Sequence, residues 1–173
     1  EIDPEISKIY QDFFPGDRII IGDAHQYLLE HYKEYGFIWS SPPCPTHSDI
    51  RRCGVHAGRY EAKYPDMDLY QEIILLKTFA PKKTKFVVEN VVPYYKPLIE
   101  AQKLQRHLFW ANFEIKPLDK EFKTTRIHNN IIGSSEVYGF SLDKYKIKNK
   151  RTILRNLVNP EIGKHILDCA NIS

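Results

Sequence analysis

The chain has 173 residues, of which 42% are hydrophobic and 27% charged, and its formal net charge is +3 at pH 7. These values predict one compact globular domain, and they neither require nor exclude a nucleic-acid partner. The three cysteines are an odd number without a Cys-x-x-Cys pair, which argues against a disulfide framework or a metal site and favours the cytoplasm. No apolar run approaches the roughly 18 residues that span a bilayer, so a soluble protein without a membrane partner is expected.

Helices and strands alternate along the chain, which predicts an α/β fold with a parallel sheet covered by helices. Pro4 suits the first position of a helix that ends near Pro15. Three β-branched residues at 19–21 predict a short strand, the pattern at 27–32 predicts a helix, and residues 37–39 predict the next strand.

The segment after this strand lacks a regular pattern. Three prolines between residues 42 and 45 remove backbone donors, and residues 46–64 show no clear periodicity. Loops of this length inside compact domains are usually functional, so a mobile loop is expected.

Regular structure is expected to resume with a helix from Asp66 and a strand at 85–88 that ends at Glu89. Farther on, residues 108–115 predict a strand, and Asn159 precedes a C-terminal helix.

Two of the predicted strands lead to side chains that can do chemistry, Cys44 and Glu89. Ligands of open α/β sheets bind at the carboxyl ends of the strands. A single cysteine is more often a small buried hydrophobe, and a polar residue often closes a strand. Their occurrence on neighbouring strand-helix units nevertheless favours a site at this edge.

The residues around this pair resemble a known family. Pro42-Pro43-Cys44-Pro45 resembles the Pro-Cys motif of cytosine-5 methyltransferases, and Glu89-Asn90-Val91 resembles their Glu-Asn-Val motif, in the same order. The resemblance implies a Rossmann-like methyltransferase fold that depends on S-adenosylmethionine, with a mostly parallel sheet and helices on both faces. It further implies methylation of carbon 5 of a cytosine flipped out of double-stranded DNA.

Three further segments resemble motifs of this family. Glu1-Ile2-Asp3-Pro4 resembles the acidic motif at the cofactor ribose, and Gly22-Asp23-Ala24 resembles the motif at the adenine. Residues 154–160 resemble the final Asn-x-Val-x-Pro motif, with Arg155 where glycine is usual. The residues that the resemblance places at S-adenosylmethionine are Glu1, Ile2, Asp23, Ala24, Pro42 and Asn156.

The resemblance also implies catalytic roles. The Cys44 thiolate adds to carbon 6 of the base, and Glu89 bonds ring nitrogen 3 and the exocyclic amine, a role that favours a raised pKa. Asn90 orients either the base or the Pro-Cys turn. Arg126 lies in a segment that only partly resembles the family's Gln-x-Arg-x-Arg motif. A free thiol is mostly protonated at neutral pH, so either a positive environment from Arg51, Arg52 or Arg126 or a concerted deprotonation is expected.

Two basic segments are candidates for phosphate contacts. The residues assigned to nucleic acid are Ser48, Arg51, Arg52 and Arg59 in the loop and Lys146, Lys148, Lys150 and Arg151 in a second tract. Simple solvation of a polar surface explains either segment as well.

The chain departs from the family in two respects. The glycine-rich cofactor turn is absent, and Glu1 stands where the second strand of the fold finishes, so the first strand is expected to be truncated or supplied by a second chain. Residues 1–173 are interpreted as one catalytic domain in which residues 104–155 form a very short target-recognition segment. Within it, Phe109 and Trp110 are interpreted as core aromatics in preference to a base-stacking edge, and His107 receives no role.

Three functions follow. The first is a small bacterial or phage DNA cytosine methyltransferase, as found in restriction-modification. The second keeps the chemistry but acts on RNA such as transfer RNA. The third is a non-catalytic nucleic-acid-binding subunit or remnant of a split methyltransferase, although such a module needs neither Cys44 nor Glu89.

Overall fold

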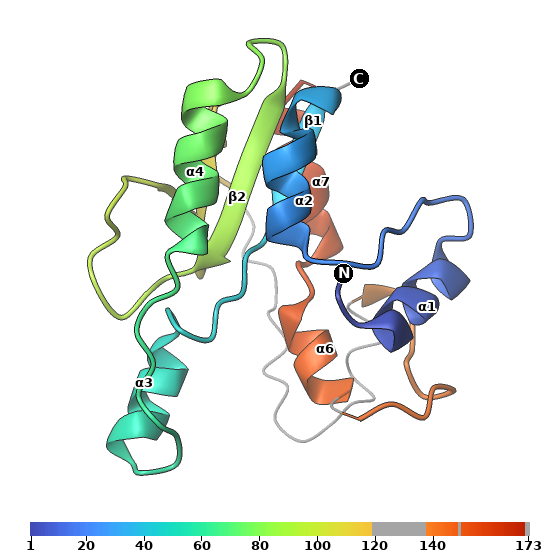
Figure 1. Ribbon diagram of the computed structural model, residues 1–173, viewed down its shortest axis with the longest axis vertical. Helices are drawn as coiled ribbons and strands as arrows, with labels where there is room; N and C mark the ends of the chain where they lie inside the picture. The colour runs from blue at the N-terminus through green and yellow to red at the C-terminus, as the bar shows by residue number, and fades with distance from the viewer. Residues whose placement is uncertain (119–137, 149, 172–173) are drawn as a thin grey trace. The chain divides into compact units, whose positions relative to one another are not determined.

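The structure is a computed structural model that describes residues 1–118, 138–148 and 150–171, and Figure 1 shows its elements in ribbon form. The chain divides into two compact units. The sheet unit is Ala24–Leu118, and the terminal unit combines Glu1–Asp23 with the described part of Asp119–Ser173. No helix of the described residues is long and apolar enough to cross a membrane.

The sheet unit contains a four-stranded sheet in the order β1-β2-β4-β3. The strands are β1 Phe37–Ser40, β2 Lys85–Val91, β3 Gln102–Leu104 and β4 His107–Ala111. Only the β1–β2 pair is parallel, whereas β4 is antiparallel to both of its neighbours. The α/β class is therefore confirmed, but the expected mostly parallel sheet is wrong.

A hairpin explains why the sheet is mixed. Two residues, Gln105 and Arg106, connect β3 to β4, and a connection this short joins only antiparallel strands. Gln105 has a φ of 53°, the left-handed conformation that tight hairpin turns require. A hairpin thus completes the sheet where the sequence suggested one long strand at 108–115.

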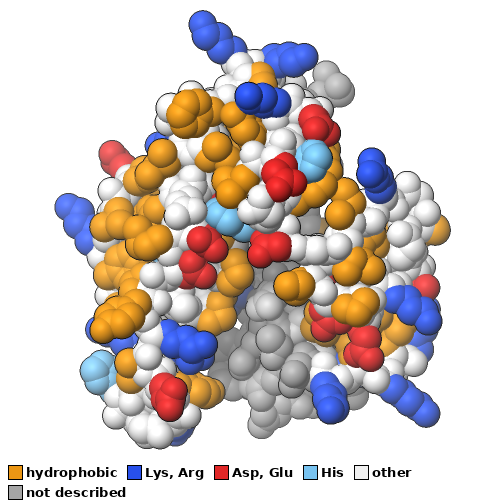
Figure 2. All heavy atoms as spheres, viewed as in Figure 1, with side chains coloured by type: hydrophobic (Ala, Val, Ile, Leu, Met, Phe, Trp, Pro, Cys, Tyr) orange, Lys and Arg blue, Asp and Glu red, His pale blue; other side chains and the backbone are white. Residues whose placement is uncertain are grey.

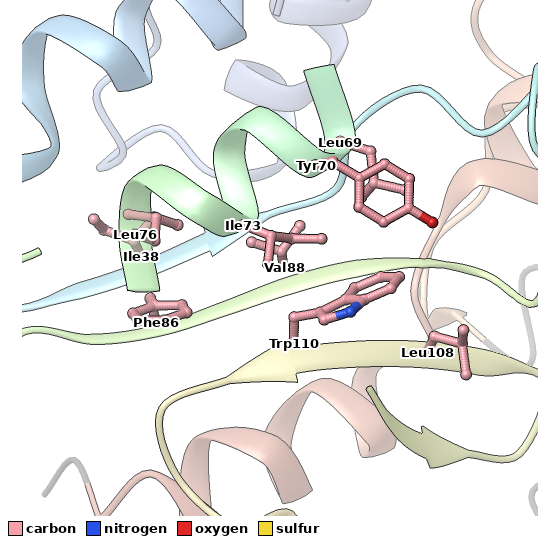
Figure 3. Close-up of a cluster of buried hydrophobic side chains, with 9 residues drawn as sticks. All are labelled: Ile38, Leu69, Tyr70, Ile73, Leu76, Phe86, Val88, Leu108 and Trp110. Carbon is pink, nitrogen blue, oxygen red and sulfur yellow. The ribbon is translucent and has the colours of Figure 1, made fainter. Parts of the chain in front are cut away.

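Four helical segments accompany this sheet: α2 Ala24–His31, the 3₁₀ turn Tyr32–Glu34, α3 Asp49–His56 and α4 Asp68–Phe79. The core lies between α4 and one face of the sheet, as Figure 3 shows. Ile73 of α4 and Val88 of β2 are both fully buried there. Burial of each such side chain contributes about 1.5–3 kcal/mol, which fixes α4 and hence the segment that precedes it.

Side chains alternate along β2, so neighbouring residues serve different faces. Phe86 and Val88 point to α4, as does Asn90, whereas Val87 and Glu89 point to the opposite face. The family-like Glu-Asn pair therefore places its two side chains on different faces of one strand.

The terminal unit contains α1 Pro4–Phe13, α6 Lys150–Asn156 and α7 Pro160–Cys169. Asp3 caps α1 by accepting hydrogen bonds from the backbone N–H groups of Glu5 and Ile6, as its position before Pro4 predicts. A small core of Ile9, Leu142 and Leu154 joins α1 to later residues.

Several predicted elements have different bounds or are absent. The strand expected at 19–21 is wrong, because these residues have no regular structure. The stretch 46–64, expected to be a loop, contains α3, and the strand at 85–88 continues to Val91 because β4 pairs with it along that length. The strand expected to reach residue 115 ends at Ala111, where the Asn112 side chain bonds the backbone of Phe86 and Thr84 instead.

Candidate active site

The Pro-Cys turn leaves β1 at the carboxyl end of the parallel pair. The Cys44 carbonyl accepts hydrogen bonds from the backbone N–H groups of His47 and Ser48, both at 3.0 Å. The Thr46 hydroxyl oxygen accepts a hydrogen bond of 3.0 Å from the Asp66 backbone N–H, which ties the turn to the chain before α4. Prolines that remove donors and a carbonyl that receives two bonds give Cys44 a single, well-defined backbone position.

Asn90 joins this turn to the neighbouring strand β2. Its side-chain Nδ2 donates a hydrogen bond of 3.0 Å to the Pro42 carbonyl, and its Oδ1 accepts one of 3.0 Å from the Val91 N–H. Asn90 is only 2% exposed, so removal of its amide would leave the buried Pro42 carbonyl without this hydrogen bond. Of the two roles considered for Asn90, the structure contains the one toward the Pro-Cys turn.

His47 forms a buried support for the turn that the sequence did not indicate. Its Nδ1 lies 2.6 Å from the Tyr95 hydroxyl, and its carbonyl accepts a hydrogen bond of 3.2 Å from the Tyr94 N–H. The Tyr70 hydroxyl of α4 lies 3.4 Å from that of Tyr95. Burial lowers the pKa of His47, so the ring is neutral at pH 7 and fits this polar contact without a counter-ion.

Glu89 is a nearly buried carboxyl group, 8% exposed, on the sheet face opposite α4. Burial raises the pKa of Glu89, which outweighs the opposing effects of a hydrogen bond from Ser41 and the charge of Arg106. The direction agrees with the expectation for a carboxyl group that donates a proton or a hydrogen bond.

Cys44 and Glu89 lie close enough to interact electrostatically. Burial is the main cause that raises the pKa of the Cys44 thiol, and the charge of Glu89 raises it further. Cys44 as a residue is nevertheless only half-buried. A thiol that follows β1 and an acid of its parallel neighbour β2 thus lie within electrostatic reach of each other.

The expected positive environment of Cys44 is absent from the described residues. Arg51 lies 5.2 Å from the centre of the Tyr60 ring, and Arg52 forms an ion pair of 3.0 Å with Asp49. Neither arginine lowers the pKa of Cys44, which is raised. Arg126 lies outside the described residues, so concerted deprotonation is the route that the site as described leaves to the thiolate.

His107 is the residue of this site that sequence reasoning missed. Its Nε2 lies 3.7 Å from Oε1 of Glu89, and burial together with the charge of Arg106 lowers its pKa to about 4. The pairing of His107 with Val91 brings it to Glu89. The alternation of His107 and Phe109 along a strand was the only available signal, and it gave no partner strand.

The interpretation of Phe109 and Trp110 as core aromatics is confirmed, since each is only 1% exposed. The ring of Phe109 packs edge-on to Trp39, with ring centres 6.3 Å apart, on the face that carries Glu89. Trp110 belongs to the core under α4 (Figure 3).

The residues expected at S-adenosylmethionine are divided between the two units. Glu1, Ile2, Asp23 and Asn156 belong to the terminal unit, and Ala24 and Pro42 belong to the sheet unit. The Glu1 carbonyl accepts a hydrogen bond of 3.0 Å from the Gly22 N–H, so the acidic motif runs beside the segment that leads to Asp23. A cavity of about 550 Å³ in the terminal unit lies against Glu1 and residues 16–20.

The fit of these residues to a cofactor is partial. The carboxylate of Glu1, expected at the ribose, accepts a hydrogen bond of 2.9 Å from the Asp3 N–H, and Ile2 is 72% exposed. The Pro42 carbonyl is occupied by Asn90. The Glu1 carboxylate and the Pro42 carbonyl thus both have intramolecular partners.

The residues assigned to nucleic acid lie on two segments. Ser48 precedes α3, which carries Arg51 and Arg52. Figure 1 shows α3 beyond the carboxyl ends of β1 and β2, and Figure 2 shows basic, acidic and hydrophobic side chains intermixed there. Arg59 follows α3 and is exposed.

The second basic tract is in part helical, which the sequence did not indicate. Lys146 and Lys148 are exposed, and Lys150 begins α6 and donates a hydrogen bond of 3.2 Å to the Asp143 carbonyl. Arg151 lies in α6, with its side chain outside what the structure describes.

Metal chemistry has no candidate ligands in the described part of the chain, where no three His, Cys, Asp or Glu residues form a cluster suited to an ion. Comparison with known proteins gives no match among family models, curated sequences or solved structures.

Proposed function

We propose that this chain is the catalytic part of a cytosine-5 methyltransferase that acts on DNA and is built on a Rossmann-like methyltransferase fold. The observation that carries the proposal is that the Glu89 charge acts on the half-buried Cys44 thiol, which follows β1, while Glu89 lies on the parallel neighbour β2. Asn90 holds the turn between them. The Pro-Cys and Glu-Asn-Val motifs that resemble the family thus supply a nucleophile and an acid to the same site.

The substrate must first leave the base stack. Carbon 6 of a stacked cytosine is out of reach of a side chain, and extruding the base costs a few kcal/mol. The basic residues around α3 are the candidates for holding the opened duplex, because the half-buried Arg51 and the exposed Arg52 and Arg59 provide charge for phosphates.

Covalent addition then uses both side chains. Cys44 Sγ, losing its proton to solvent as it attacks, forms a bond to carbon 6, and the electrons of the 5,6 double bond move toward ring nitrogen 3. Glu89 gives its proton to that nitrogen, so no full negative charge develops on the ring. The raised pKa of Glu89 favours the protonated form that this step needs.

The adduct makes carbon 5 nucleophilic, and bound S-adenosylmethionine supplies an electrophilic methyl group for it. Glu1, Ile2, Asp23, Ala24, Pro42 and Asn156 are the residues proposed to hold that cofactor. After carbon 5 loses its proton, the double bond re-forms and Cys44 Sγ departs with its electrons. Glu89 then takes back the proton of nitrogen 3.

The experiment uses duplex DNA that contains 5-fluorocytosine. Fluorine replaces the carbon-5 hydrogen that must be removed as a proton before Cys44 can leave, so the adduct becomes trapped. The protein is incubated with this DNA and S-adenosylmethionine and run on a denaturing gel. We expect a covalent complex that Cys44→Ala abolishes and Cys169→Ala, at a half-buried cysteine of α7, leaves unchanged.

A second readout does not depend on the methyl donor. Reversible addition of Cys44 to unmodified cytosine exchanges the carbon-5 hydrogen for solvent deuterium. Single-stranded RNA and transfer RNA serve as parallel substrates. If adducts form only on RNA, then RNA and not DNA is the substrate. Absence of both trapping and exchange on every nucleic acid would overturn the proposal in favour of a binding role.

A further inference from the structure

We infer that His107 is a further catalytic residue, which donates a hydrogen bond from Nε2 to the 2-carbonyl oxygen of the pyrimidine held by Glu89. The inference rests on the proposed function and adds to it a residue that the family-like motifs do not contain. It assigns the place beside Glu89 to a neutral imidazole on β4.

The sheet places His107 and Glu89 on one face. Glu89 pairs with Phe109 and Val91 pairs with His107, so positions 89, 91, 107 and 109 share a face. The distance of 3.7 Å between His107 Nε2 and Glu89 Oε1 exceeds that of a hydrogen bond. Within the described residues the His107 ring makes no hydrogen bond, and 17% of its side chain is exposed.

The spacing of the two groups matches adjacent positions on a base. Ring nitrogen 3 of cytosine lies between the exocyclic amine and the 2-carbonyl oxygen. If Glu89 occupies the amine and nitrogen 3, the next atom along the edge is this oxygen. His107 Nε2 and Glu89 Oε1, which lie 3.7 Å apart, can therefore contact the 2-carbonyl oxygen and nitrogen 3 of one pyrimidine at the same time.

The charge state of His107 suits the chemistry. Its pKa of about 4 makes the ring neutral at pH 7, so one nitrogen still carries a proton. The charge of Arg106 opposes the protonated form of Glu89, but burial outweighs it, and a neutral His107 adds no second cation beside the acid. Addition of sulfur to carbon 6 increases the negative charge on the 2-carbonyl oxygen, which a fixed N–H stabilises.

The imidazole is held by its surroundings. The ring of His107 lies edge-on to Phe109, with centres 6.4 Å apart, and Phe109 is buried. The hairpin turn is joined to β2 by a hydrogen bond of 3.4 Å from the Val92 N–H to the Arg106 carbonyl. Rigid placement of this kind is what a group that acts only in the transition state requires.

The test combines a change in the protein with a change in the base. Rates of carbon-5 hydrogen exchange are measured with cytosine and with 2-thiocytosine, whose sulfur is a weaker acceptor. His107→Leu is expected to slow exchange on cytosine by about 10² to 10³ while the KM for DNA changes little. His107→Gln, which retains an N–H donor, is expected to recover most of that loss.

The decisive result is the interaction between the two changes. Wild-type protein is expected to slow down on 2-thiocytosine, whereas His107→Leu is expected to lose nothing further, because the contact is already gone. His165→Leu, in α7, a helix with no assigned role in the reaction, serves as the control and is expected to retain the wild-type rate.

The two failures are distinguishable. If the wild-type protein exchanges hydrogen and His107→Leu does so equally fast, or if the two losses multiply independently, the role of His107 is overturned while the proposed function stands. If the folded wild-type protein exchanges no hydrogen and traps no fluorinated base, both are overturned.

Discussion

Two neighbouring regions of the sheet unit differ in how their side chains are held. The catalytic turn, defined as residues 40–48, is held by a hydrogen bond from the Asn90 side chain and by backbone hydrogen bonds to the Cys44 carbonyl. The α3 segment, defined as residues 49–65, has exposed apolar residues such as Ile50 at 81% and Tyr64 at 94%. Chemistry needs a fixed geometry, whereas enclosing a long polymer needs a surface that is still open.

This contrast predicts where substitutions act. Changes in the catalytic turn or its supports should reduce the rate of reaction, and changes in the α3 segment should reduce the affinity for nucleic acid. The predictions below test that division, beginning with the largest expected effect.

Asn90→Ala tests the support of the catalytic turn. It removes the donor to the buried Pro42 carbonyl, so the free energy of unfolding should fall by about 1–3 kcal/mol and adduct formation should fall by at least tenfold. Chemical denaturation and the fluorocytosine gel measure the two effects.

Asn112→Ala is the matched control, because its side chain also bonds the backbone of β2 and of the preceding Thr84, but at the other end of the strand. It should cost a similar stability without loss of adduct. Equal loss of adduct in both variants would show that Asn90 acts only through general stability.

Glu89→Gln tests the buried acid. Burial raises the pKa of Glu89 above its ordinary value of 4.5, so the folded state binds the proton more tightly than the unfolded state. The stability due to this proton is therefore present at low pH and is lost as the pH rises above 4.5. Glu89→Gln should flatten that decline in thermal unfolding measured from pH 4 to 8, while adduct formation is lost.

The pH profile of the reaction adds a second check on this pair. The reactive form carries a Cys44 thiolate and a protonated Glu89. Because the pKa of the acid lies below that of the thiol, the rate should rise with pH below the Glu89 pKa, stay level between the two pKa values and fall above the Cys44 pKa. A rate that increases from pH 8 to 9 would contradict the need for the Glu89 proton, and a rate that decreases there would contradict the need for the Cys44 thiolate.

Gly54→Ala tests the packing of the α3 segment. A Cβ at this position would come within 2.4 Å of the Tyr60 ring, which is 54% exposed and therefore able to move aside. We expect a loss of stability of no more than about 1 kcal/mol and weaker DNA binding, measured by fluorescence anisotropy. The double variant with Tyr60→Ala should recover the stability. An unchanged DNA affinity in the single and the double variant would show that α3 does not contact the nucleic acid.

Arg52→Ala should have the smallest effect on stability, below about 1 kcal/mol, since its ion pair with Asp49 is exposed. If Arg52 contacts a phosphate, the slope of log affinity against log salt should decrease by about 0.9. Lys164→Ala in α7, which also loses an exposed ion pair, is the control and should leave the slope unchanged. An unaltered slope in Arg52→Ala would remove this arginine from the interface.

The sequence predicted the parts of the fold that depend on local patterns. Pro4 marked the first turn of α1, and the helix expected from Asp66 is α4, which begins at Asp68. Residues 19–21 were misassigned because β-branched composition alone does not form a strand without a partner along its length.

The candidate site was predictable only where adjacent residues carry the signal. Cys44 and Glu89 stood out by their neighbours, whereas His107 depended on the pairing of β4 with β2, a contact between distant residues. The direction of β4 was equally hidden, because the two-residue turn at Gln105 and Arg106 has no glycine to mark it. Support by His47 and Tyr95 likewise joins side chains 48 positions apart.

The most direct measurement of the central claim is the identity of the residue that bonds the base. The complex formed on 5-fluorocytosine DNA is digested with nuclease and protease, and the modified peptide is sequenced by mass spectrometry. The account predicts one methylated fluorocytosine adduct on Cys44. An adduct on Cys53 or Cys169, or a trapped complex that persists in Cys44→Ala, would contradict it.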